Sequence, residues 1–199
     1  MRLIKAKAFT LVEVLLALTI IGVIAALTIP NLLTDTSSTA LRTKFKATFT
    51  LFQDGLIHAE NVQKHHFVDV GEVNTNDAKY SLQQYMHHHF NARRINRTEA
   101  PEGITYELKT GAQIIFPPET QATMTATGCT ISEPCTLFID VNGRSGPNEI
   151  VNCTTGTTSE ALNEPCTVDE KVVADIFPIK VQRSHILPLT NAASYILNH

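Results

Sequence analysis

The chain has 199 residues, the length of one domain with an appended element, so a two-domain enzyme is not expected. Hydrophobic residues make up 43% and charged residues 18%, and the apolar excess is concentrated near the N-terminus. The formal net charge of −3 implies no basic surface for nucleic acid, and nucleic-acid binding is therefore not indicated.

The N-terminal segment has the pattern of a membrane span behind a basic leader. Residues 1–8, MRLIKAKA, contain three bases and no acid. Residues 9–29, FTLVEVLLALTIIGVIAALTI, contain one ionisable side chain, and as a helix they would reach about 31 Å, the thickness of a bilayer's hydrocarbon core. The positive-inside rule keeps the basic end in the cytoplasm and predicts an N-in, C-out topology.

Two simpler interpretations of this segment remain open. A cleaved secretory signal would use small residues such as Ala25 and Ala26, although its apolar region should be shorter and free of carboxylates. The second interpretation is a plain signal anchor, in which Glu13 is an acid without a function. A lipoprotein anchor is not expected, because no cysteine follows the apolar stretch.

Glu13 is the informative residue of the span. An acid inside the hydrocarbon costs about 2.5 to 3.5 kcal/mol at the centre and less near an end, so a compensating group is expected. If the chain were cut before Phe9, the new α-amine would lie one helical turn from Glu13. Between two staggered parallel helices, the amine of one copy could pair with Glu13 of its neighbour and fix the stagger.

The run KAKAFTLVEVLLALTIIGVIAALTIP resembles the N-terminus shared by type IV pilins and type II secretion pseudopilins. The resemblance implies cleavage between Ala8 and Phe9 by a prepilin peptidase, N-methylation of Phe9 and an assembly role for Glu13. It also implies three further partners: related pilin subunits, an inner-membrane assembly platform, and membrane lipid before assembly. The family usually has Gly before the cut, where this chain has Ala8.

One long helix is expected from Phe9 to about His65. Apolar residues recur at helical spacing after the span, at Leu41, Phe45, Phe49, Phe52, Leu56 and Ala59, which predicts a core-facing stripe. Gly55 lowers helix propensity locally. Pro30 predicts either a bend near residues 26–30 or the end of the membrane helix. The expected organisation is a leader at 1–8, a membrane and filament-core helix at 9–30, and a globular domain at 31–199.

The remainder of the chain predicts a small sheet. Asn76 or Asp77 is expected to cap a second helix reaching about Ala92. Residues 104–116 contain two β-prone runs separated at Thr110 and Gly111, a hairpin signal, and residues 136–141 supply another strand. Residues 117–130 and 152–170 are polar and Thr-rich, typical of loops. The expected fold class is α+β, with the long helix packed on a small antiparallel sheet as in pilins.

Four cysteines lie in the C-terminal third, at Cys129, Cys135, Cys153 and Cys166. An even number in a segment expected outside the membrane favours disulfides over zinc, because the chain has no Cys-x2-Cys pair. Of the three possible pairings, short loop closure favours 129 with 135 and 153 with 166, although loop length discriminates weakly.

The segment FIDVNGRSGPN, residues 138–148, resembles part of the C-terminal sheet of pilin-like proteins, where a later D-x-F element follows. That element would be residues 175–177 here, after a long insertion. Some pseudopilins bind calcium in such loops, and the candidate oxygen ligands are Asp140, Asn142, Asn148 and Asp175, with Ser145 as a further oxygen. A set of tight turns explains the same residues, and we favour the turns.

Catalysis and histidine metal sites are not expected. His87, His88 and His89 are consecutive and would point in different directions on a helix, and no His-Glu-x-x-His motif, nucleophile elbow or phosphate loop occurs. The sequence therefore predicts a structural subunit of a type IV pilus or pseudopilus-like filament. The alternative is a minor pilin or a singly anchored extracytoplasmic binding or adhesion module.

Overall fold

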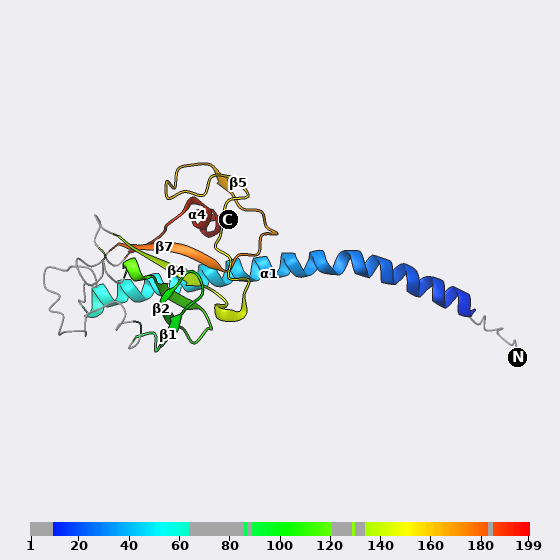
Figure 1. The fold of residues 1–199 in the computed structure, drawn as a ribbon, viewed down its shortest axis with the longest axis horizontal. Helices are drawn as coiled ribbons and strands as arrows, with labels where there is room; N and C mark the ends of the chain where they lie inside the picture. Colours follow the sequence, from blue (N-terminus) through cyan, green and yellow to red (C-terminus); the bar gives the residue numbers. More distant parts are fainter. Residues whose placement is uncertain (1–9, 64–85, 87–88, 121–128, 130–133, 183–184) are drawn as a thin grey trace, which may run out of the picture.

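A single long helix organises the molecule. The computed structural model describes residues 10–63, 86, 89–120, 129, 134–182 and 185–199. Helix α1 spans Leu11–Gln63, and its first half projects alone while its second half packs within the domain (Figure 1). The prediction of one long helix is confirmed. The alternative in which the helix ends at Pro30 is wrong, because α1 continues through this residue with a gentle curvature of its projecting half (Figure 1).

A six-stranded antiparallel sheet lies against the second half of α1. Its order is β1-β2-β3-β4-β7-β8. The strands are β1 Arg93–Arg97, β2 Gly103–Glu107, β3 Gln113–Phe116, β4 Cys135–Asp140, β7 Ile176–Gln182 and β8 His185–Pro188. The hairpin signal at residues 110–111 is confirmed by the β2–β3 pairing, in which Tyr106 faces Ile114. The expected strand at 136–141 is confirmed as β4, and the α+β class is confirmed with it.

Several elements were not predicted from the sequence. Strand β1 reads RRINR, which lacks β-like alternation, and β7 contains Pro178 in its middle, which argues against a strand. Helix α4, Asn191–Asn198, begins at the N-cap Thr190, whose side chain accepts a hydrogen bond from the backbone of Ala193. The segment 152–170, expected as loop, contains a two-residue ladder of β5, Thr155–Gly156, and β6, Cys166–Thr167. A short 3-10 helix, η3, occupies Gly143–Ser145.

The predicted second helix falls largely outside the described residues. Its expected final residues, 89–92, form a turn and a bend that lead into β1. The expected helix end at Ala92 is therefore wrong: Asn91 has a φ of 48°, a left-handed conformation incompatible with a continuing right-handed helix.

The core lies between the stripe on α1 and the inner face of the sheet. Phe45, Phe52 and Leu56 are fully or almost fully buried, and the ring of Phe45 stacks on that of Phe177 with centroids 4.0 Å apart. Phe49 is partly buried against the same cluster, and the side chain of Ala59 lies outside the described set. The predicted stripe is confirmed for its described members, and it fixes which face of α1 meets the sheet.

Candidate functional site

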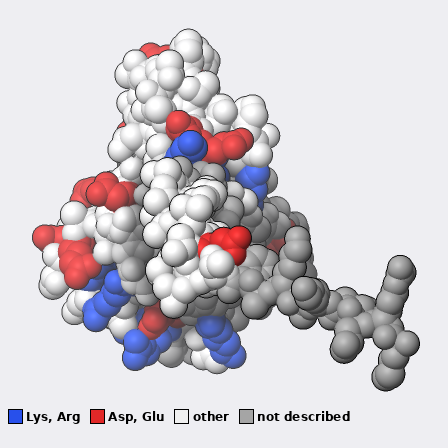
Figure 2. Space-filling view, turned by 90° about the vertical axis from the view of Figure 1, so that its right-hand side faces the viewer, with Lys and Arg blue, Asp and Glu red and all other residues white. Residues whose placement is uncertain are grey.

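The projecting half of α1 is an unpartnered apolar surface. Residues Leu11–Ile29 form a stretch with a mean hydropathy of 2.5, long and apolar enough to cross a membrane. None of it is buried, with Leu11 75% and Leu27 70% exposed. Figure 2, a view along the helix toward the domain, shows charged side chains around the domain and an almost uncharged surface on the helix itself. Apolar area of this extent requires cover from lipid or from other helices.

Glu13 closes a capping box at the start of α1. The backbone N–H and the hydroxyl of Thr10 donate to Glu13 Oε2 over 2.8 and 2.9 Å, and the Glu13 N–H donates back to Thr10 Oγ1 over 3.3 Å. This is the Thr-x-x-Glu pattern, which satisfies donors that the first helical turn leaves free. The sequence TLVE contains the signal for this capping box, at residues 10–13. Ala8 and Phe9, on either side of the expected cut, lie outside the described residues.

Four calcium candidates converge at one junction of the sheet, despite the long insertion between them. Asp140 ends β4 and Asp175 directly precedes β7, and both side chains are fully buried. Asp140 Oδ1 accepts the backbone N–H groups of Asn142 and Gly143. The Asp175 carboxylate accepts the N–H of Asn148 over 3.0 Å and that of Glu149 over 2.8 Å. Backbone donors thus fix both ends of the 141–149 loop. Ser145 lies in η3 and is exposed.

Arg97, which the sequence did not single out, lies among these residues. Its guanidinium pairs with Asp140 Oδ2, and the two side chains are only 3% and 0% exposed. It also donates to Gln113 Oε1 over 3.2 Å and to Asn148 Oδ1 over 2.9 Å. Burial raises the pKa of Asp140, and the hydrogen bond and charge of Arg97 oppose that rise.

The junction does not fit a calcium ion. Calcium takes six to eight oxygen ligands, whereas both oxygens of each buried carboxylate already accept protein hydrogen bonds. Among described side chains, Asn142 Oδ1 is the one buried polar atom without a hydrogen-bond partner, and this single free oxygen is far fewer than calcium takes. No group of three histidine, cysteine or carboxylate side chains able to hold a metal occurs in that part of the chain. The tight-turn interpretation agrees with this geometry.

The cysteines form two disulfides, Cys129–Cys135 and Cys153–Cys166, the pairing that short loops favour. The second closes a loop whose residues are mostly exposed. The side chain of Asn191 holds this loop against α4: its Oδ1 accepts the Ser159 N–H over 3.0 Å and its Nδ2 donates to the Thr157 carbonyl over 2.6 Å. The result is a constrained, solvent-facing surface beside the C-terminal helix.

The N-terminal segment is similar to a known family motif. Residues 4–29 match the model described as the prokaryotic N-terminal methylation motif. The chain carries a type IV prepilin signature. The signature ends at residue 29, the last residue of the membrane-length apolar stretch Leu11–Ile29. No curated protein and no solved structure shows significant similarity to the chain, so the domain behind the prepilin signature is characterised by its structure alone.

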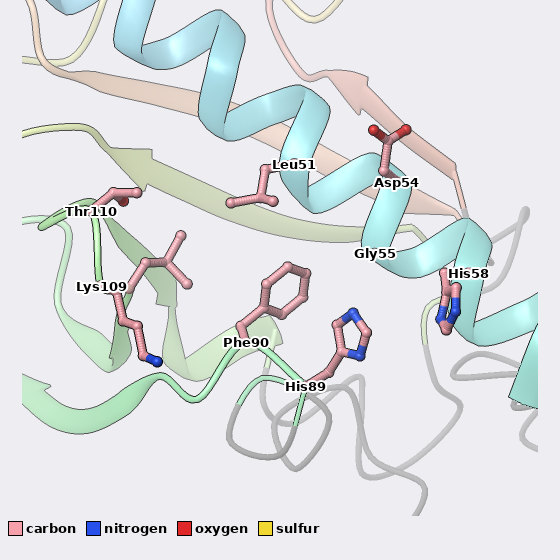
Figure 3. Close-up of a pocket in the computed structure, with 9 residues that line it drawn as sticks. Leu51, Asp54, Gly55, His58, His89, Phe90, Lys109 and Thr110 are labelled. Atoms are coloured by element: carbon pink, nitrogen blue, oxygen red, sulfur yellow. The ribbon is translucent and has the colours of Figure 1, made fainter.

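A groove of about 520 Å³ lies between α1 and the β2–β3 turn of this prepilin-like chain (Figure 3). The rings of His58 and His89 approach each other at one end, with centroids 5.4 Å apart. Phe90 packs on Gly55, where an added Cβ would come within 2.2 Å of the ring. Gly55 therefore permits a close approach in addition to lowering helix propensity. His87 and His88 lie outside the described residues.

Proposed function

We propose that this protein is a structural subunit of a type IV pilus or pseudopilus-like filament. It is made as a membrane-anchored precursor, cut between Ala8 and Phe9, methylated at Phe9 and assembled from the inner membrane. In the filament, the apolar half of α1 packs with the same segment of neighbouring subunits, and the sheet faces outward.

One observation carries this proposal: an apolar helix with no buried residue in its membrane-length stretch, bearing the prepilin signature, projects from a folded domain. A helix of this kind is stable in lipid, and it is equally stable in a bundle of its own copies, so one segment serves both before and after assembly. The two oxidised cysteine pairs agree with a domain outside the cytoplasm.

The processing step is tested by the mass of the exported protein. We expect intact-mass measurement to show a chain that begins at Phe9 with one added methyl group. Co-expression with and without a prepilin peptidase provides the control, because the uncut chain should accumulate in the membrane when the peptidase is absent. Retention of residues 1–8 in the exported protein would refute the cut.

The assembly role of Glu13 is tested by the variant Glu13→Ala. It should insert into the membrane as well as the parent, because the substitution removes a costly acid from the hydrocarbon. Its amount in sheared filaments should fall to background, because the α-amine of the neighbouring subunit loses its partner. Asp54→Ala, which removes an exposed acid on the domain half of the same helix, is the matched control and should assemble normally. Normal filaments from Glu13→Ala would contradict the role.

A second function is favoured by the exposed loop closed by the Cys153–Cys166 disulfide. A minor pilin at the filament tip, or a singly anchored protein, would use such a surface to bind a ligand. Abundance separates the two: a major subunit should dominate sheared surface material, whereas a minor pilin or an anchored module should not.

A further inference from the structure

One buried cation, the guanidinium of Arg97, lies beside the 141–149 loop and bonds to its residue Asn148. Arg97 is the last residue of β1, and its guanidinium forms an ion pair with Asp140 at the end of β4. Two buried carboxylates, Asp140 and Asp175, lie at this junction, and burying unpaired charge is strongly unfavourable. Each of the two carboxylates accepts hydrogen bonds from its own set of donors. Arg97, which donates to Asp140, is the charged donor, and the others are backbone N–H groups.

We propose that Arg97 is a built-in counter-ion that does the work of a bound divalent cation in this loop, so that the loop keeps its shape and the domain keeps its stability without calcium.

The hydrogen-bond pattern of the guanidinium supports this role. Arg97 donates to four acceptors: the side chains of Gln113, Asp140 and Asn148, and the carbonyl of Glu99. These acceptors come from β3, from β4, from the loop itself and from the β1–β2 connection. A planar fork of N–H donors suits such an arrangement of fixed oxygens, in the way that a metal ion gathers oxygen ligands from separate segments.

The charge balance explains why a guanidinium and a divalent ion exclude each other here. Asp140 Oδ2 and Asn148 Oδ1 accept from Arg97, and Asp140 Oδ1 accepts from the backbone of Asn142 and Gly143. An entering cation that used the first two oxygens would have to displace a guanidinium that is 3% exposed. It would also meet the positive charge at close range in a poorly screened interior.

The backbone of the loop depends on the same residue. Asn148 has a φ of 58°, a left-handed conformation that Asn tolerates better than most residues. Its side-chain oxygen accepts from Arg97 while its N–H donates to Asp175. Arg97 and Asp175 therefore hold the turn from its two sides. Loss of the guanidinium would remove the hydrogen bond to the Asn148 side chain.

Thermal unfolding of the full chain in detergent, in excess CaCl2 and in excess EGTA, tests the proposal. The parent should unfold at the same temperature in both. Arg97→Met should unfold about 10 °C lower, because removal of one partner leaves a buried carboxylate uncompensated. Arg94→Met, on the same strand but exposed, is the matched control and should unfold close to the parent.

If Arg97→Met does not accumulate, the double variant Arg97→Met, Asp140→Leu should accumulate and unfold above the single variant, since it removes both charges of the pair. Three results would overturn the proposal: a saturable rise of the parent's unfolding temperature with calcium, equal unfolding of the Arg97 and Arg94 variants, or a double variant no more stable than the single one. None of these measurements depends on filament assembly, so they stand or fall apart from the proposed function.

Discussion

Two charged side chains, Glu13 and Arg97, differ in which groups satisfy their hydrogen bonding and charge. Arg97 finds its acceptors within the folded chain, and four hydrogen bonds satisfy it. Within the described part of the chain, Glu13 accepts from Thr10, and its helix surface is covered by no other described residue. The interactions of Arg97 are thus complete within the folded chain. Glu13 instead lies on an apolar helix surface that lipid or another subunit would have to cover.

The rings of His58 and His89 lie together at the groove, where protonation of His89 is disfavoured. Desolvation lowers the pKa of His89 below its usual value of 6.5, and the positive charge of His58 lowers it further. His89 therefore binds its proton less readily in the folded state than in the unfolded chain. Its contribution to stability is complete above pH 6.5 and is lost as the pH falls through the lowered folded pKa. Asp54 and Lys109 also line the groove.

We therefore expect the unfolding temperature to fall between pH 7 and pH 5.5, and to fall less in His89→Gln and His58→Gln. His185→Gln, which removes an exposed histidine on β8, is the control for general acid effects and should follow the parent. Identical pH profiles for the parent and both groove variants would remove the histidine pair as the cause.

At the scale of elements, α1 is one continuous helix whose two halves have different surroundings. Among the side chains that the structure describes, Ser38 is the first buried one of the domain half, and it donates to the carbonyl of Glu170, while Leu41 and Phe45 begin the core. The first half contributes no buried residue between Leu11 and Ile29. The two halves should therefore be separable by truncation between them.

Deletion of residues 1–29 should give a domain that is soluble without detergent, elutes as a monomer in size-exclusion chromatography and keeps its cooperative unfolding. Phe45→Ala in this background should lower the free energy of unfolding by about 3–5 kcal/mol, because it empties a fully buried site stacked on Phe177. Thr43→Ala, an exposed position on the same turns, serves as its control. Aggregation of the truncated domain would show that the projecting half stabilises the fold.

At the scale of the whole molecule, the long helix, the β2–β3 hairpin and β4 were all predictable, because each follows from a local pattern. Apolar spacing sets the buried face of α1, and a Thr-Gly turn between β-prone runs sets the hairpin register. Strands β1 and β7 were not predictable in this way. Each is extended because it pairs with neighbouring strands: β1 pairs with β2, and β7 lies between β4 and β8.

The sequence by itself determined the N-terminal segment and its chemistry, since a basic leader, an apolar span and one acid are all properties of consecutive residues. Only the tertiary structure decided the character of the β4–β7 junction. Asp140 and Asp175 are separated by a long insertion, and Arg97 lies on a strand with no β-like pattern, so no local signal places them together. The pairing of the strands brings these residues together. It places the guanidinium of Arg97 at the oxygens that the sequence suggested as calcium ligands.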